Sequence, residues 1–527
     1  MNAKLKDVVI AGGGLAGLTL AYQLKRSQSE LDIVVIEKGT FPKPEKTAKV
    51  GESTVEIGSH YLNHTLDLKQ HFNERHLRKH GLRCFFGEPQ NDFSQQDEIG
   101  VSELFGIPAY QIDSGAIENY LQELVISEGV ELIDGASTSD LEISETKKSI
   151  TVSTLSGQRR INSRWIVDAA GRQSLVKNKL GLHKESKHKG NALWFRIDRQ
   201  IKLDDWSQDQ AWQKRIKQDN TRWLSTNHLM GPGYWVWVIP LDNGATSIGI
   251  VMDDEAFASH DFSNYESTFE WLSKHHSRCA QAIDGADVLD YVVINDYSLD
   301  CKQMFSDQGW GLTGEAGVFA DPFYSPGSDF IALNNSFITK LIDDDIKGQD
   351  IRLNSQVFQF INQSFFNSTM SLYTNEYGGF GDRQMMALKL VWDYAYYWGV
   401  LSLLFFRSTM IDVGLMRELN PTLTLAFEAN NKIQALFRER AKIRLVIPAQ
   451  GLFMDQYQVP CLRHYNDVLK QTMEGPVVST QVLLKDNVDK LERLAKYLDN
   501  ILSDHPDTNI SQDERELLGE YRRIVLA

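Results

Sequence analysis

Apolar and polar positions at the start of the chain predict a strand, a turn, a helix and a second strand. The apolar run 8–11 leads into three consecutive glycines, and residues 15–25 have the spacing of an amphipathic helix. A second apolar run over 32–37 ends in Glu37. Because the first run stops at the glycines, we expect a buried strand there and not a signal peptide.

The pattern changes twice further along the chain. Residues 130–160 alternate apolar and polar positions with turn residues between them, which predicts a small antiparallel segment. Aromatic runs separated by polar loops predict an antiparallel sheet over 185–305, and beyond residue 330 the pattern is helical. The charged, amphipathic tail 480–527 predicts either a helix that packs on the rest of the chain or a contact with a second copy.

The most apolar later stretch, 398–406, is about half the ~20 residues that a bilayer-spanning helix needs. We therefore interpret it as a core helix. The aromatic residues around it either form a substrate-facing wall or fill the core, and they are Trp392, Tyr394, Tyr396, Tyr397, Trp398, Phe405 and Phe406.

Composition narrows the class of protein. A chain of 527 residues is too long for one core, and its 42% hydrophobic and 24% charged residues are typical of a globular protein. The formal charge of −15 argues against nucleic acid and anionic membranes as partners. The four cysteines contain no CxxC pair, so we expect no metal site and no disulfide framework, and a reducing cytoplasm is the simplest location.

The glycine turn has the spacing of a dinucleotide site. GxGxxG between a strand and a helix lets backbone amides approach a pyrophosphate at the helix N-terminus. An acid at the end of the second strand accepts a hydrogen bond from a ribose hydroxyl. The expected contacts are Gly12, Gly14, Leu15, Ala16, Gly17, Glu37 and Lys38.

Two further segments resemble the flavin-contacting motifs of flavin monooxygenase-like folds. Residues 165–172 resemble the strand and turn that return to the cofactor, and residues 309–322 resemble the GD…DP motif with glutamate in place of the first aspartate. The resemblance implies FAD as the cofactor. Apart from the glycine turn, GxGxxG recurs only at 309–314, inside the second flavin-contacting segment, so the resemblance also implies that a separate reductase supplies the reduced FAD. The contacts it implies are Asp168, Gly171, Gly314, Glu315, Asp321 and Pro322.

Three more motifs extend the resemblance to the flavin-dependent halogenases, which are relatives of the single-component aromatic hydroxylases. Segment 49–54 is similar to the GVGE[AS] segment beside the flavin in that family and contributes Gly51, Glu52 and Ser53. Lys79 begins a Lys-x-Gly sequence like the one that carries the essential lysine of the family. The WxWxIP motif is matched at every fixed position, by Trp235, Trp237, Ile239 and Pro240.

The resemblance implies how these residues act. Reduced FAD, O₂ and chloride or bromide give hypohalous acid, the strand with Trp235 and Trp237 separates flavin from substrate, and Lys79 holds or activates the acid. Lys79 then serves either as an ammonium donor or as a haloamine, and both roles favour a desolvated lysine with a lowered pKa. Alternating tryptophans also arise from sheet packing, and Lys79 lies in a basic stretch where surface lysines are common.

The sequence departs from the family at three places. Pro326 stands where a backbone amide commonly contacts halide, and proline has no N–H, which leaves Gly327 and Ser328 as donors. Tyr324 replaces the glutamate with which tryptophan halogenases accept the ring proton, which favours a phenol, pyrrole or other activated ring over free tryptophan. Ser114 replaces an arginine found in many relatives.

We therefore expect an α/β (α+β) fold with a Rossmann-like FAD-binding domain of the aromatic hydroxylase type. The expected divisions are an FAD-binding unit over 1–184 and 296–345, a substrate-side β-sheet with WxWxIP over 185–295, and a helical region over 346–527. The expected partners are a small aromatic substrate, free or tethered to a carrier protein, a flavin reductase and a second copy. The rival functions are an aromatic hydroxylase or flavin oxidase, and a non-catalytic flavin-binding partner protein.

Overall fold

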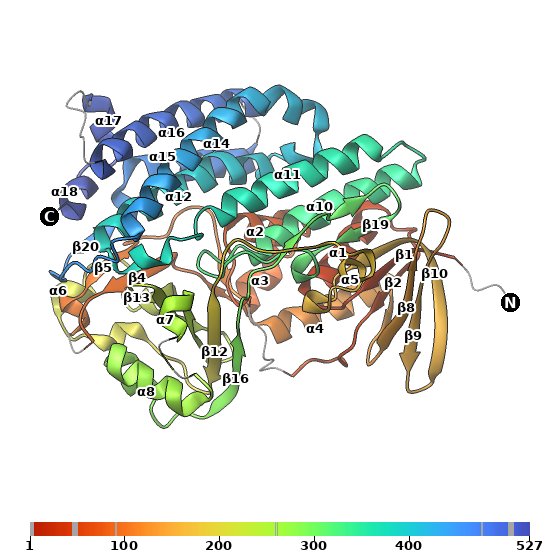
Figure 1. The fold of residues 1–527 in the computed structure, drawn as a ribbon, viewed down its shortest axis with the longest axis horizontal. Coiled ribbons are helices and arrows are strands. Elements are labelled where there is room, and N and C mark those ends of the chain that lie inside the picture. Colours follow the sequence, from red (N-terminus) through yellow and green to blue (C-terminus); the bar gives the residue numbers. More distant parts are fainter. Residues whose placement is uncertain are drawn as a thin grey trace.

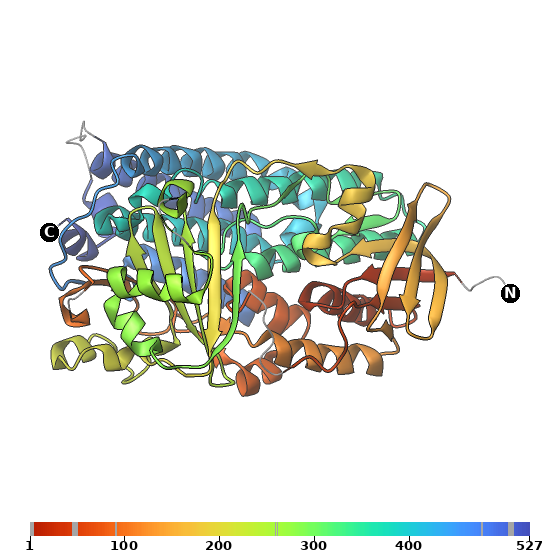
Figure 2. The same ribbon diagram turned by 60° about the horizontal axis from the view of Figure 1, so that its bottom comes forward.

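Two eight-stranded sheets lie end to end, and a layer of helices from the C-terminal third covers both of them (Figures 1 and 2). A computed structural model describes residues 5–44, 51–89, 92–258, 260, 262–475, 478–503 and 511–526. The N-terminal and C-terminal ends of the described chain lie on opposite sides of the molecule, along its long axis in Figure 1.

The first sheet is built around the strand that opens the chain. Its order is β18-β19-β10-β1-β2-β7, and β10 continues into an antiparallel ribbon with β9 and β8. The central strands β10, β1, β2 and β7 are parallel, as in a doubly wound nucleotide-binding sheet. The strands are β1 Lys6–Ala11, β2 Ile33–Ile36, β7 Glu131–Ile133, β8 Ser137–Ile143, β9 Lys148–Thr154, β10 Gly157–Asp168, β18 Phe305–Ser306 and β19 Trp310–Leu312.

The second sheet carries the WxWxIP sequence in its middle. Its order is β16-β12-β15-β14-β13-β4-β5-β20, with antiparallel pairs except for β13–β4 and β5–β20. The strands are β4 Leu82–Phe86, β5 Asp97–Gly100, β12 Asn191–Ile197, β13 Thr226–Gly231, β14 Tyr234–Pro240, β15 Thr246–Met252, β16 Val288–Ile294 and β20 Phe453–Asp455. Two small ribbons join β3 Leu77–Arg78 with β6 Tyr110–Gln111, and β11 His183–Lys184 with β17 Asp300–Cys301.

The two longest helices before α10, α1 and α4, cover the first sheet. The helices from α10 onward form the long layer above both sheets in Figure 1. The helices are α1 Leu15–Ser27, α2 Glu56–His60, α3 Lys69–Arg75, α4 Ser114–Ser127, α5 Leu175–Leu180, α6 Gln210–Gln213, α7 Asp254–Ala258, α8 Tyr265–His275, α9 Ser277–Ile283, α10 Gly327–Ile346, α11 Arg352–Met370, α12 Arg383–Tyr396, α13 Leu403–Phe406, α14 Val413–Ala441, α15 Pro460–Glu474, α16 Thr480–Leu502, α17 Gln512–Glu516 and α18 Tyr521–Val525. Two π-helical turns, Tyr61–Thr65 and Tyr397–Ser402, continue α2 and α12.

The second sheet extends beyond the predicted range 185–295. Strands β4 and β5 come from the segment assigned to the FAD-binding unit, and β20 comes from the region predicted to be helical. β4 pairs with the edge of β13, β5 pairs with β4, and β20 pairs with the outer edge of β5. These partners are far apart in sequence, so residue spacing could not reveal them. The predicted domain boundaries stay a prediction.

Strand β14 divides its side chains between two cores, as alternation along a strand requires. Trp235, Trp237 and Ile239 belong to the large core shared with the first sheet and the C-terminal helices. Val236 and Val238 belong to a second core formed with α8 and α9. The motif therefore presents its aromatic face toward the centre of the molecule.

The tail and the aromatic stretch pack within the chain. On α16, apolar side chains at helical spacing are buried, and Lys432 of α14 pairs with Asp499 at 2.5 Å. Trp392 is buried and donates a hydrogen bond from Nε1 to Asn430 Oδ1 at 2.9 Å. None of the described helices combines the length and apolar character needed to cross a membrane. All four cysteines are buried and unpaired.

Candidate active site

The glycine turn after β1 is so tightly packed that side chains are excluded. Gly12 has φ +114°, and a Cβ there would lie 2.2 Å from the carbonyl oxygen of Ala169. A Cβ on Gly17 would lie 1.9 Å from the carbonyl oxygen of Gly12. These contacts bring β1, the turn and α1 together and leave Gly14 as the residue that caps the helix. The geometry is that of a turn against which a pyrophosphate rests.

Glu37 fixes this turn from the neighbouring strand. Its carboxylate accepts hydrogen bonds from the amides of Gly13 at 2.7 Å and Gly39 at 2.9 Å, and from Lys43 Nζ at 2.8 Å. Burial alone would raise the pKa of Glu37, but these donors outweigh it and lower that pKa. Glu37 and Lys38 do not line the large cavity described next, so their contact with a ribose stays a prediction.

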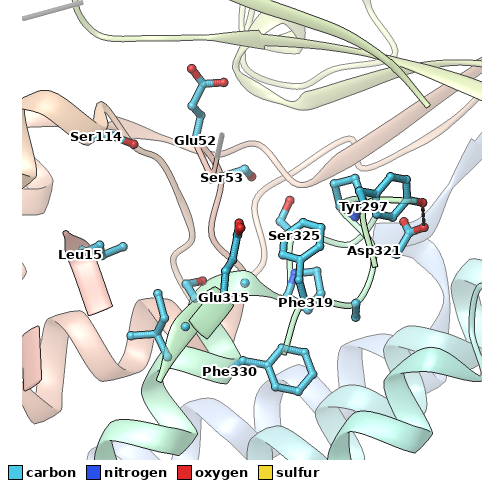
Figure 3. Close-up of a pocket in the computed structure, with 18 of the residues that line it drawn as sticks. Leu15, Glu52, Ser53, Ser114, Tyr297, Glu315, Phe319, Asp321, Ser325 and Phe330 are labelled. Atoms are coloured by element: carbon cyan, nitrogen blue, oxygen red, sulfur yellow. Dashed lines mark hydrogen bonds between the residues drawn. The ribbon is translucent and has the colours of Figure 1, made fainter. Parts of the chain in front are cut away.

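A cavity of about 430 Å³ runs from the start of α1 to the start of α10 (Figure 3). Gly14, Leu15 and Ala16 line one end of it, and Gly327 and Ser328 line another part. Two helix N-termini therefore face this space, and each presents backbone amides without intrahelical partners. The cavity brings together segments that are more than 300 residues apart.

The predicted flavin residues take different positions around this cavity. Gly171, Gly314, Glu315, Asp321 and Pro322 line it, and Figure 3 shows Glu315 and Asp321 on its wall. Glu315 Oε2 lies 2.9 Å from Arg172 Nε, so its charge is balanced within the site.

Asp168 faces away from the cavity. Its two oxygens accept hydrogen bonds from the amides of Ala170 at 3.0 Å and Val176 at 2.7 Å. It does not line the cavity and instead holds the turn that positions Gly171. The predicted contact of Asp168 with the cofactor therefore stays a prediction.

Asp321 lies at the centre of a buried hydrogen-bond network. Its Oδ2 accepts hydrogen bonds from the hydroxyls of Tyr297 and Tyr377, both at 2.5 Å, and lies 2.7 Å from His188 Nε2. The Tyr377 hydroxyl also accepts a hydrogen bond from Trp235 Nε1 at 3.0 Å. The network thus connects the second flavin motif with the WxWxIP strand.

Both tryptophans of the WxWxIP strand line the large cavity. Trp235 and Trp237 have their ring centroids 5.7 Å apart and are almost fully buried. Trp237 donates a hydrogen bond from Nε1 to Ser247 Oγ at 3.1 Å and packs over Gly249. Their hydrogen-bonded indoles form a fixed wall on one side of the cavity.

The segment with Gly51, Glu52 and Ser53 lines the same cavity, whereas its first residues, Lys49 and Val50, lie outside the described residues. Gly51 has φ +115°, which favours glycine. Burial raises the pKa of Glu52 to about 7, and a hydrogen bond from Ser247 opposes that shift only in part. Glu52 can therefore hold or release a proton near neutral pH.

Lys79 lies in a second, smaller cavity of about 50 Å³. It follows β3 and is 5% exposed, and Gly81 with φ +68° completes the turn into β4. Lys79 Nζ donates hydrogen bonds to Ser53 Oγ at 3.0 Å and to the carbonyl oxygen of Thr54 at 3.1 Å. Burial lowers the pKa of Lys79 to about 8, although the charges of Glu56 and Asp329 raise it in part.

Aromatic side chains from the C-terminal helices form the other walls of the Lys79 cavity. They include three members of the predicted aromatic stretch, while Trp392 and Trp398 lie in the core, and a substrate-facing role of the three stays a prediction. The aromatic lining residues are Tyr324, Phe365, Tyr373, Tyr394, Tyr396 and Tyr397.

Pro326 lines both cavities, so the loop before α10 separates them. Trp235 and Trp237 line only the larger cavity, because the aromatic face of β14 is directed to that side. The division between the two spaces is therefore made by Pro326 and by Ser53, which lines the large cavity and binds Lys79. The predicted partition by Trp235 and Trp237 stays a prediction.

Several residues of the two cavities carry no sequence signal that pointed to them. His188, Tyr297 and Tyr377 reach Asp321 from separate elements, and no spacing rule connects them. Asp329 lines the Lys79 cavity, but an acid in the first turn of a helix is an ordinary stabilising feature and drew no attention. Only its place directly after Gly327 and Ser328, the predicted halide donors, could have indicated a role.

Comparison with known proteins identifies the class of protein to which this chain belongs. Residues 6–277 match the family model of the FAD binding domain, and the chain belongs to that family of flavoproteins. The glycine cradle, which any Cβ would fill, and the two helix N-termini fit a dinucleotide, so FAD is confirmed as the cofactor. The predicted fold class is also confirmed.

Within that family the chain is similar to flavin-dependent halogenases, which confirms the resemblance seen in its motifs. A flavin-dependent halogenase of Dictyostelium discoideum is 28% identical over 64% of this chain and 60% of its own length. A 1H-pyrrole-2-carbonyl-[peptidyl-carrier protein] chlorinase of Pseudomonas fluorescens is 28% identical over 63% of this chain and 74% of its own length. The chain thus matches less than two thirds of the first of these relatives.

Solved structures share the fold over nearly the whole chain. Halogenase PltM, crystallised with phloroglucinol and FAD, superposes with a TM-score of 0.68 at 16% identity and covers 98% of both chains. A flavoprotein/dehydrogenase from Cytophaga hutchinsonii superposes with a TM-score of 0.58 at 20% identity, over 91% of this chain and 99% of its own.

Proposed function

We propose that this protein halogenates a small electron-rich aromatic ring, using reduced FAD, O₂ and chloride or bromide. The observation that carries the proposal is the pair of adjoining cavities: one has the flavin motifs, and the other has a buried lysine and no flavin motif. A hydroxylase needs its substrate beside the flavin, whereas separate spaces suit an oxidant that is made in one and used in the other.

The residues of the large cavity hold the cofactor and the halide. Reduced FAD bound there supplies the two electrons with which O₂ and a halide ion yield hypohalous acid. The amides of Gly327 and Ser328 begin the 20-residue helix α10 and line the cavity, so they present N–H groups and a positive helix end to an anion. Pro326 lacks an N–H, so these two amides are the donors that the loop retains.

We assign to Lys79 the role of receiving hypohalous acid at the junction of the cavities. Two of its N–H groups point to Ser53 and Thr54, which leaves one position on Nζ for a ligand in the cavity. With a pKa of about 8, Lys79 is mostly an ammonium ion at neutral pH. We therefore favour the ammonium role over the haloamine, since the third N–H can donate to the oxygen of the acid and make it a better leaving group.

The Lys79 cavity suits one activated ring of the phenol or pyrrole type. Its tyrosine-rich wall offers ring faces for stacking. The Tyr373 hydroxyl is buried and its O–H finds no acceptor among the described residues, so it can donate a hydrogen bond to a polar group on the substrate. The related chlorinase is named for a carrier-bound pyrrole, and PltM was crystallised with the phenol phloroglucinol, so both a free and a tethered ring stay open. An indole is larger and suits this cavity less well.

A separate flavin reductase, a second copy and a cytoplasmic location complete the proposal. The reductase rests on the absence of a GxGxxG outside the two flavin-contacting segments, the second copy on the amphipathic tail 480–527, and the location on four cysteines without a CxxC pair.

The test is single-turnover mass spectrometry on the wild-type protein. Chemically reduced FAD, O₂ and a panel of phenols, pyrroles and pyrrolyl thioesters are combined with chloride, bromide or no halide. A halogen isotope pattern that requires halide supports the proposal and identifies the ring class. A gain of one oxygen without halide would establish the rival hydroxylase, for which Pro326 is the best argument. Flavin oxidation without either product would indicate an oxidase or a binding protein.

A further inference from the structure

Two carboxyl groups line the Lys79 cavity, Asp329 at the start of α10 and Asp393 on α12. A halogenated ring must lose one proton, and Tyr324 stands where tryptophan halogenases have a glutamate for this step. Tyr324 cannot replace that glutamate as a base, because its hydroxyl donates to Asp393 Oδ2 at 2.6 Å and burial raises its pKa well above the usual value. The base must come from elsewhere in the cavity.

Asp393 is already occupied by a cation and by neutral donors. Lys389 Nζ lies 3.0 Å from its Oδ2, and the amide of Gln434 donates to its Oδ1 at 2.7 Å. Together with the bond from Tyr324, these contacts hold both oxygens and balance the charge. Both oxygens of Asp393 are therefore occupied, and loss of its charge would leave the buried Lys389 less well compensated.

Asp329 differs because only neutral groups hold it. Its Oδ1 accepts a hydrogen bond from the amide of Gly58 at 2.8 Å, and its Oδ2 accepts one from the Tyr397 hydroxyl at 2.7 Å. It is 1% exposed and forms no ion pair with a described Lys or Arg side chain. Burial raises the pKa of Asp329 to about 8, so it binds a proton far more tightly than an ordinary aspartate.

We propose that Asp329 is the base that removes the ring proton and that it works as an acid–base pair with Lys79. This inference rests on the proposed halogenation. The ring carbon gives an electron pair to the halogen of hypohalous acid, and the halogen–oxygen bond breaks. The leaving hydroxide takes a proton from the Lys79 ammonium and becomes water. The ring C–H bond then breaks, its electrons restore aromaticity, and the proton goes to Asp329.

The pair returns to its starting state by one proton transfer within the cavity. After the reaction Lys79 is an amine and Asp329 is a neutral acid, and both line the same cavity. Transfer of one proton from Asp329 to Lys79 regenerates both groups. Because the two groups have similar pKa values near 8, this transfer is close to balanced.

The experiment compares ring-protonated and ring-deuterated forms of one accepted phenol in the wild type, Asp329→Asn and Asp393→Asn. Halogenated product per oxidised flavin is measured by mass spectrometry and absorbance. In wild type the two isotopic forms should give equal yields. In Asp329→Asn the yield should fall at least about tenfold, with flavin oxidation unchanged, and the deuterated form should give the lower yield. The dissociation constant of Asp329→Asn for the phenol, measured by calorimetry without FAD, should stay within about threefold of the wild-type value. Such a result shows that the cavity is intact.

Three results would overturn the inference. One is an Asp329→Asn protein that halogenates as well as wild type with no isotope effect, and another is an isotope effect confined to Asp393→Asn. If Asp329→Asn does not fold, the wild type is measured instead at about pH 6, where Asp329 is protonated. Equal yields from the protonated and deuterated phenol at that pH are the third result. A wild type that halogenates no ring is a different failure, since it removes the proposed function and this pair with it.

Discussion

Halogenation should have a bell-shaped pH dependence because two groups of opposite kind share the Lys79 cavity. Activity requires Lys79 as an ammonium ion and Asp329 as a carboxylate, and burial places both pKa values at about 8. As pH falls below 8 Asp329 becomes protonated, and as pH rises above 8 Lys79 loses its proton. Glu56 and Tyr397 also face Asp329; burial raises both of their pKa values, so Tyr397 keeps its proton throughout this range.

The expected magnitude follows from these two ionisations. If each titrates with a pKa of about 8, about a quarter of the molecules hold both active forms at pH 8. The same product of fractions is about a twelfth at pH 7 and at pH 9, so the yield should fall about threefold on either side of the maximum. Because the groups interact, the measured values describe the pair and not either residue alone.

The assay is a single turnover in which the phenol, halide and reduced FAD meet O₂ in buffers from about pH 6 to pH 10. Halogenated product is divided by the amount of flavin oxidised, so that changes in flavin chemistry do not enter the ratio. Because hypohalous acid itself ionises, its own reactivity changes with pH. The control is therefore the same phenol treated with free hypohalous acid in the same buffers. A profile parallel to that control, or a yield that rises steadily through pH 9, would refute the reasoning.

Two substitutions test the large cavity. Pro326→Ala should lower the halide concentration for half-maximal yield about tenfold, because an added N–H to an anion is worth roughly 1.5–3 kcal/mol, and an unchanged halide titration would contradict a halide site in this loop. Gly17→Ala should weaken FAD binding at least about tenfold, measured by flavin fluorescence, because its Cβ would lie 1.9 Å from the Gly12 carbonyl oxygen. Gly414→Ala on the exposed start of α14, where the nearest atom lies at 3.4 Å, is the matched control and should bind FAD normally.

Local constraints explain which features the sequence could predict. Gly12, Gly17 and Gly81 were recognisable because close packing or positive φ excludes other residues there, and such requirements leave fixed spacings in the chain. Trp235 and Trp237 were recognisable because a strand places alternate residues on one face.

The partners of these residues were hidden because they come from distant elements. The Lys79 cavity combines a loop before β4, the start of α10 and side chains from α11 and α12, and no local pattern sets their register. Asp329 and Asp393 are the same residue type, and only their neighbours in space distinguish a neutral setting from an ion pair. The place of strands β4, β5 and β20 in the second sheet was hidden for the same reason, because sequence spacing does not record which distant strands pair.

The most direct test of the two-cavity account is to remove the Lys79 amine and leave the flavin cavity intact. Lys79→Met keeps the length of the side chain, and Lys69→Met on the surface of α3 is the matched control. In a single turnover with reduced FAD, O₂, halide and an accepted ring, Lys79→Met should oxidise FAD at the wild-type rate and form no halogenated product, while Lys69→Met forms the normal amount. Undiminished halogenation by Lys79→Met would contradict the account.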